Sequence, residues 1–100
     1  MLHTVNKSPF ERNSLETCLR LAKAGSAVLL IEDAVYAAQK GTAKSTHIEG
    51  ALSDHSVYVM GPDLKARGVT EDQIIDGVTV VDYEGFVDLA VDNGTVNSWL

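Results

Sequence analysis

The run Ala27–Ile31 constrains the fold more than any other part of the sequence, because five apolar residues follow one another without a polar break. A strand with one face in water alternates apolar and polar residues, whereas a strand buried on both faces does not. Gly25 lies just before the run and Glu32 follows it, so the segment has the length of a strand and is too short for a helix. The run therefore predicts a strand inside a parallel sheet that is covered on both sides.

Short apolar segments alternate with helical segments along the rest of the chain. Further strands are predicted at Leu2–Val5, Ser56–Met60 and Val78–Val81. Helical segments are predicted from Asn13 toward Gly25, at Ala34–Gln39, Ser45–Ser53 and Asp63–Arg67, and from Asp82 to Asn93. Strands that alternate with helices run parallel and are joined by crossovers. We predict one α/β domain over residues 1–100, a three-layer α/β/α arrangement with a mainly parallel sheet of four to five strands.

Several of these helices are only about two turns long, although both faces of a parallel sheet need cover. Aromatic residues make up 6% of the chain, so the core has to be built from aliphatic side chains. A chain of 100 residues also buries a limited share of its surface. We therefore expect part of one sheet face to be covered by another subunit.

The charge balance argues against direct contact with nucleic acid. Eight basic and 14 acidic residues give a formal net charge of −6, whereas affinity for phosphate comes from clusters of Lys and Arg. No segment reaches the roughly 18 consecutive apolar residues of a membrane span, and the first residues lack a signal-peptide pattern. We expect a cytoplasmic protein without a membrane partner. In that reducing compartment the single cysteine stays a thiol unless it has redox or sulfur chemistry.

The helix that carries this cysteine has two possible starts. Ser8 and Glu11, and likewise Asn13 and Glu16, have the spacing of a capping box. We favour a short turn at Ser8 and a main helix from Asn13. Gly25 supplies a left-handed residue that ends it.

Cys18 is the candidate reactive residue of the chain. The helix has one apolar stripe at i, i+3, i+4 and i+7, formed by Leu15, Cys18, Leu19 and Ala22. This pattern predicts Cys18 at the edge of the buried face. A reactive cysteine needs a nearby cation, an imidazole or a helix N-terminus to favour its thiolate, and the local sequence supplies none of these. Two interpretations stay open: Cys18 is a small buried hydrophobe, or it is activated by other parts of the fold or by a partner chain.

Three carboxylates follow predicted strands. Glu32 and Asp33 follow one, and Asp82 follows another, at the edge where open α/β sheets place their sites. A carboxylate pair there could act as general acid and base. Helix capping by Asp33 and by Asp82 is the simpler interpretation.

The histidines His3, His47 and His55 are scattered without the spacing of metal ligands, so we predict no metal site. His3 could orient toward a site or be an ordinary, partly exposed strand residue. The segment 61–68 combines a glycine, two cations and a helix start, which suits either a plain turn or a phosphate site. Trp99 either docks on the core of its own chain or contacts a partner.

The sequence also resembles the DsrH/TusB family of sulfur-relay proteins over nearly its full length. The resemblance rests on MLHTVNKSPFERNSLETCL at the start, VLLIEDAVYAA, VYVMGPDLKARG, VVDYEGFVDL and the terminal SWL. It implies a subunit that assembles with DsrE-like and DsrF-like chains into a heterohexamer holding two copies of each. It implies no cofactor, and a role in cytoplasmic sulfur trafficking during oxidation of stored sulfur. In the TusB branch the comparable relay leads to 2-thiouridine in transfer RNA, and a TusE/DsrC-like protein is the implied sulfur acceptor.

The resemblance also bears on Cys18. DsrH-type members carry a cysteine within the first long helix, in a segment like residues 15–19, and TusB-type members generally do not. A persulfide carrier needs a thiolate that attacks a donor's sulfane sulfur and presents it to the next thiol. Our first hypothesis is that Cys18 accepts or passes persulfide sulfur, which makes the chain a sulfurtransferase component at most. The alternative is a structural subunit in which Cys18 only packs, and the weakest is an independent enzyme acting through Glu32 or Asp82.

Overall fold

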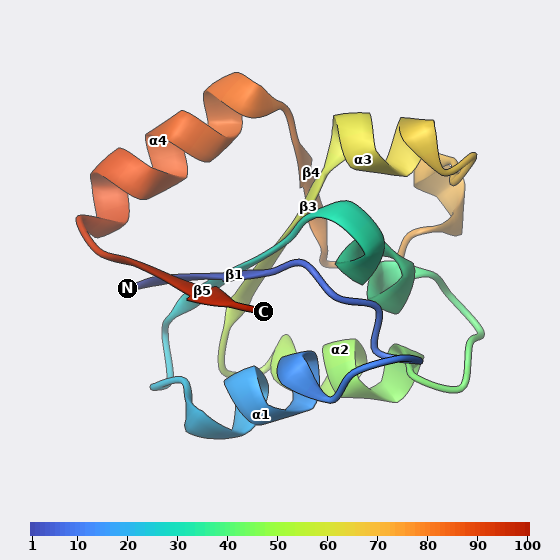
Figure 1. Cartoon of the computed structure of the whole chain (residues 1–100), viewed down its shortest axis with the longest axis horizontal. Coiled ribbons are helices and arrows are strands. Elements are labelled where there is room, and N and C mark those ends of the chain that lie inside the picture. Colours follow the sequence, from blue (N-terminus) through green and yellow to red (C-terminus); the bar gives the residue numbers. More distant parts are fainter.

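The computed structural model describes all residues, 1–100, and its centre is a five-stranded parallel sheet (Figure 1). The strands are β1 (Leu2–Val5), β2 (Ala27–Leu30), β3 (Ser56–Met60), β4 (Thr79–Val81) and β5 (Val96–Trp99). Their order across the sheet is β4-β3-β2-β1-β5, and every neighbouring pair is parallel. The predicted α/β class and parallel sheet are confirmed, with five strands.

The helices form layers on both sides of this sheet. They are α1 (Ser14–Leu21), α2 (Ser45–Ala51), α3 (Gly61–Ala66) and α4 (Tyr83–Asn93), with the 3-10 helices η1 (Glu32–Ala38) and η2 (Glu71–Gln73). Figure 1 shows α1 and α2 on one side of the sheet and α4 on the other, which gives the predicted three layers. The longest helix, α4, has 11 residues, and no helix has the length and hydropathy of a membrane span.

Two apolar clusters explain the unbroken run at β2. Val28 and Leu30 belong to the larger cluster, which also contains Cys18 of α1 and Ile48 of α2. The intervening residue Leu29 belongs to the smaller cluster, which packs against α4. Because successive side chains of a strand point to opposite faces, a strand between two clusters has to be apolar at every position.

Helix α4 covers its face of the sheet thinly. None of its 11 residues is buried. Its contacts with the smaller cluster come from Phe86, Leu89 and Ala90, which are all partly exposed. Three further apolar residues of α4, Tyr83, Val87 and Val91, are exposed and belong to neither cluster.

Strand β5 was not predicted as a strand. It pairs with β1 from Leu2↔Val96 to Val5↔Trp99, and the amide of Leu2 donates to the carbonyl of Thr95 at 2.9 Å. Strand β5 is an edge strand whose first three residues are exposed, and two of them, Asn97 and Ser98, are polar, so it lacks the continuous apolar signal that identified β2.

The predicted cap at Asp33 is wrong. The segment after β2 is a 3-10 helix that begins at Glu32, two residues before the predicted start at Ala34, and Asp33 pairs with Arg67. Helix α1 also ends at Leu21, before Gly25, which instead turns the chain into β2 with a positive φ of 87°. The cap at Asp82 is confirmed, since its Oδ1 accepts from the amide of Gly85 at 2.8 Å.

Candidate functional site

The chain approaches Cys18 through the predicted turn at Ser8. The carbonyl of Ser8 accepts from the amides of Glu11 and Arg12, and its hydroxyl accepts from the amide of Phe10. Helix α1 then begins at Ser14, but the side chain of Asn13 makes no capping hydrogen bond. The start of the helix was therefore predicted within one residue, whereas the proposed capping box at Asn13 was wrong.

Cys18 is completely buried in this structure, with 0% of its surface exposed, not at the edge of the buried face as predicted. It lies in the larger cluster, among aliphatic residues that include Val5 and Leu15. Burial raises the pKa of the Cys18 thiol to about 11, and no neighbouring charge contributes to the shift. At neutral pH the sulfur is therefore an unionised thiol.

None of the five main surface cavities is lined by Cys18. A cavity of about 520 Å³ lies at the end of α1, lined by His3, Met1 and residues 21–26. Cys18 is not among its lining residues. Because Cys18 is fully buried, a sulfur donor could reach it only after the packing around the sulfur changes.

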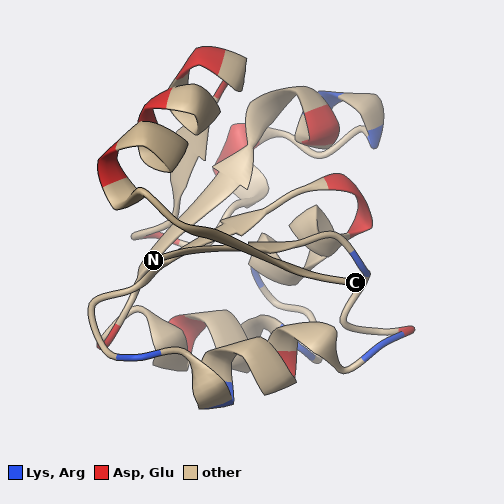
Figure 2. Cartoon of the chain, turned by 60° about the vertical axis from the view of Figure 1, so that its left-hand side comes forward, with Lys and Arg blue, Asp and Glu red and all other residues tan.

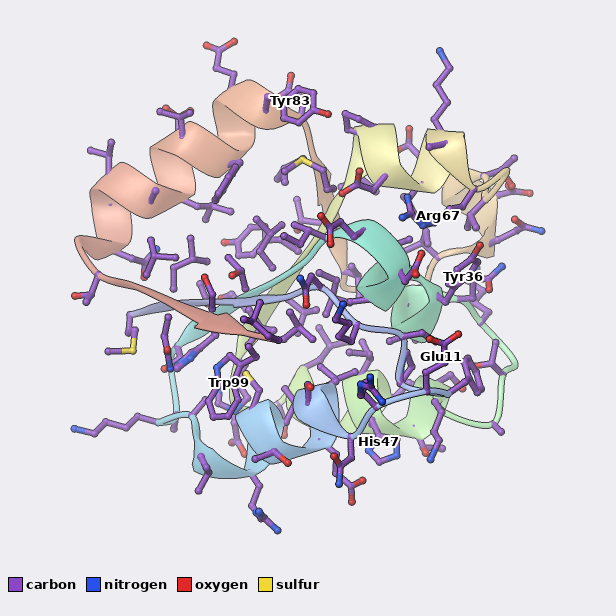
Figure 3. All side chains as sticks on the ribbon, viewed as in Figure 1. Glu11, Tyr36, His47, Arg67, Tyr83 and Trp99 are labelled. Carbon is purple, nitrogen blue, oxygen red and sulfur yellow. The ribbon has the colours of Figure 1, made fainter.

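His3 and Trp99 connect the two strands at this edge of the sheet. The indole Nε1 of Trp99 donates to Nδ1 of His3 at 3.1 Å, and the ring centroids are 6.2 Å apart. Burial lowers the pKa of His3, and the N-terminal ammonium and His55 lower it further. Trp99 packs against the larger cluster, on the α1 side of the sheet (Figure 3). In the single chain, Trp99 is thus docked on its own core, and His3 is buried, not partly exposed.

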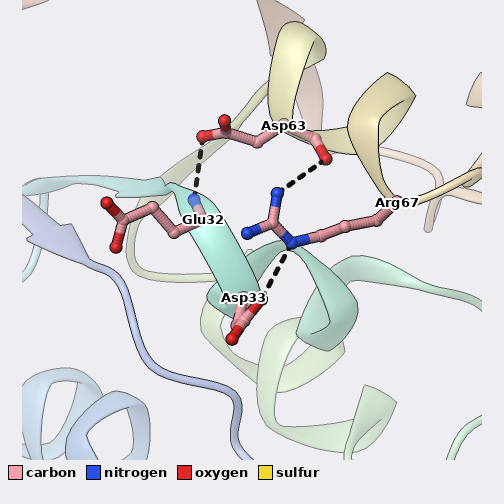
Figure 4. A network of polar contacts seen from close by, with 4 residues as sticks. All are labelled: Glu32, Asp33, Asp63 and Arg67. Atoms are coloured by element: carbon pink, nitrogen blue, oxygen red, sulfur yellow. Dashed lines mark hydrogen bonds and ion pairs between the residues drawn. The ribbon is translucent and has the colours of Figure 1, made fainter.

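The carboxylates after β2 belong to a structural network (Figure 4). The amide of Glu32 donates to the Asp63 carboxylate at 2.8 Å, while Glu32 itself has a left-handed φ of 51°. Arg67 donates through Nε to Asp33 at 2.9 Å and through Nη1 to the carbonyl of Asp63 at 3.2 Å. These bonds join η1 to α3. They involve Arg67, one of the two cations of the segment 61–68, and Asp63 in the first turn of its helix, so these two residues of the possible phosphate site already have partners.

The remaining candidates do not assemble into a metal centre. No three side chains among His, Cys, Asp and Glu come together in a way that could hold a metal ion. Asp82 caps α4, so it serves the structural role that was the simpler of its two interpretations. Cys18 is left as the residue on which a chemical role for this chain depends.

Comparison with known proteins decides the family. The family model described as "DsrH like protein" matches residues 7–96. The chain is 44% identical to protein TusB of Erwinia tasmaniensis over 100 residues, which are 99% of this chain and all of that protein. It is 39% identical to TusB of Pectobacterium parmentieri and 35% identical to TusB of Escherichia coli, again over 99% of this chain and 100% of each relative. The chain belongs to the DsrH/TusB family of sulfur-relay proteins.

Solved structures support the fold of this DsrH/TusB protein. The ychN protein of Escherichia coli superposes with a TM-score of 0.83 at 22% identity, covering 98% of this chain and 97% of that one. A protein of unknown function from Methanobacterium thermoautotrophicum gives a TM-score of 0.68 at 15% identity, with 97% and 95% covered. At these identities the likeness concerns the fold alone.

The sequence of this DsrH/TusB chain only partly indicated the depth of Cys18 and the contact between His3 and Trp99. The stripe of Leu15 and Cys18 pointed inward, but local periodicity could not say how deeply α1 is seated on the sheet. The bond between His3 and Trp99 joins residues 96 positions apart, so only the terminal Trp hinted at a docked end.

Proposed function

We propose that this chain serves a sulfur relay as a structural subunit, binding DsrE-like and DsrF-like chains in a heterohexamer with two copies of each. In this proposal Cys18 is a packing residue and the persulfide is carried by a partner. The main support for this proposal is the complete burial of Cys18, which raises the pKa of its thiol to about 11.

The chemistry of persulfide transfer explains why that observation matters. A thiolate attacks the outer sulfur of a donor persulfide, the donor's S–S bond breaks, and the donor leaves as a thiolate. The receiving sulfur therefore has to be ionised and reachable. With a pKa of about 11, roughly one Cys18 thiol in 10,000 is ionised at pH 7, and the sulfur has no contact with solvent.

The second candidate is the carrier role of Cys18. It is supported by the location of Cys18 in the first helix, α1, which is where the resemblance to DsrH-type chains leads us to expect a cysteine. This role requires partner chains to shift α1 away from β1 and β5. Such a shift would expose Cys18 and lower the pKa of its thiol. A TusE/DsrC-like protein would then accept the sulfur.

For the pathway, we propose the transfer-RNA branch, which leads to 2-thiouridine, because relatives named TusB match the chain over its full length. Oxidation of stored sulfur is the alternative. The net charge of −6 opposes direct contact with RNA, so the chain would act through its partners.

The test is a reconstituted relay containing the DsrE-like, DsrF-like and TusE/DsrC-like proteins of the same organism. We expect Cys18→Ala to leave sulfur transfer to the acceptor unchanged, and omission of the whole chain to reduce it. Loss of transfer with Cys18→Ala, in a complex of unchanged mass, would replace the structural role with the carrier role.

A further inference from the structure

Helix α4 carries a row of exposed apolar residues next to the residues that pack on the sheet. Tyr83, Val87 and Val91 are 64%, 58% and 73% exposed. They are spaced four residues apart and so lie above one another on one face of the helix. Figure 3 shows Tyr83 at the first turn of α4, on the outside of the molecule. Single exposed apolar residues are ordinary, but an aligned row on one helix is typical of a contact surface.

A row of acidic residues lies beside the apolar one. Glu84, Asp88 and Asp92 repeat with the same spacing, and all three are exposed. Each follows its apolar neighbour by one position, which is about 100° around the helix. Figure 2 shows acidic positions along α4 and no basic ones.

The charge of this region is one-sided. All eight Lys and Arg residues lie at or before Arg67, so residues 68–100 contain no cation. The same part of the chain holds seven of the 14 acidic residues. The carboxylates of α4 thus have no basic residue on their own helix or on the following strand, and none of them pairs with a cation of this chain.

We infer that the outer face of α4, defined by Tyr83, Val87 and Val91 with the acidic row beside them, docks a different protein chain that presents apolar residues flanked by Lys or Arg. This inference rests on the proposed function, since it names the surface that meets a partner. The apolar row supplies buried area, and the acidic row selects a partner of positive charge.

A second copy of this chain does not fit the same surface. Two α4 helices packed on their apolar rows would gather six carboxylates around one contact, and neither copy could supply a cation from residues 68–100. Like charges placed together oppose association. A nucleic acid or an anionic membrane is repelled by the same acidic row.

The test compares assembly of two charge-reversed variants with the DsrE-like and DsrF-like chains of the same organism. The first, Asp88→Lys with Asp92→Lys, changes the α4 face. The matched control, Glu16→Lys with Glu49→Lys, makes the same change of charge at exposed positions of α1 and α2, on the opposite side of the sheet. Sedimentation velocity at low and moderate salt measures the dissociation constant, and thermal unfolding checks that both variants fold.

We expect the α4 variant to weaken assembly by about tenfold or more at low salt, and by less as salt rises. The control should assemble like the unmodified chain. A third variant, Val87→Ser, should weaken assembly without a change in salt dependence, because it removes apolar contact and no charge.

Two results would overturn the inference. Equal assembly of the α4 variant and the unmodified chain would remove α4 from the interface while leaving the proposed subunit role intact. Self-association of the unmodified chain that Val87→Ser abolishes would assign the surface to a second copy. If the unmodified chain assembles with neither partner, the proposed function fails and the inference fails with it.

Discussion

The rate at which Cys18 reacts with a thiol reagent follows directly from its surroundings. At pH 8 a thiol with a pKa of about 11 is ionised in about one molecule in 1,000, against about one in ten for the ordinary pKa of 9.0. This loss of about 100-fold is partly offset, by roughly tenfold, because a thiolate of higher pKa is a stronger nucleophile. Ionisation alone therefore slows labelling about tenfold, and exclusion of the reagent from a fully buried sulfur slows it further.

The assay is labelling by a disulfide reagent under native conditions. The matched control is Cys18→Ala combined with Glu16→Cys, which places the only thiol at an exposed position of the same helix. We expect Cys18 to react at least about tenfold more slowly than this control, and to approach its rate in denaturant, where α1 no longer covers the sulfur. Equal rates in native buffer would refute the argument that Cys18 is sealed and unionised.

Two further predictions concern stability. Because the pKa of His3 is lowered in the fold, unfolding binds a proton, so this contribution to stability is present above about pH 6.5 and is lost as pH falls toward the lowered value. Urea unfolding between pH 7.5 and 5.5 measures this loss, and His3→Gln should remove its share. Gly85→Ala should destabilise the protein by about 1–3 kcal/mol, because the added Cβ would lie 2.9 Å from Cβ of Val81. Gly50→Ala, in α2 with nothing within 4 Å of the new Cβ, should instead be neutral or stabilising by up to about 1 kcal/mol; equal effects at the two sites would contradict this packing.

Local sequence patterns predicted the parts of the fold that depend on local physics. The run at β2 was recognisable because burial on two faces demands apolar residues at every position, and the observed strand is Ala27–Leu30. Asp82 was recognisable as a cap because its side chain bonds an amide three residues away. Both sequence signals can be recognised from residues that are neighbours along the chain.

The parts that were missed depend on contacts between distant segments. Strand β5 is an exposed edge, and its pairing with β1 is set by the path of the whole chain. Asp33 was expected to cap a helix, but Arg67, 34 positions away, lies within 2.9 Å of it. The depth of Cys18 likewise depends on how α1 sits against the sheet. The chemistry expected of the candidate site was therefore less predictable than the fold that contains it.

Whether this chain supports a sulfur relay without carrying sulfur itself can be measured from the mass of the chain inside its assembled complex. The complex is treated with a persulfide donor, and the subunits are separated without reductant and weighed. We expect added sulfur on a partner chain and an unmodified mass for this chain. An increase by the mass of one sulfur atom on this chain, abolished by Cys18→Ala, would instead make Cys18 a sulfur carrier.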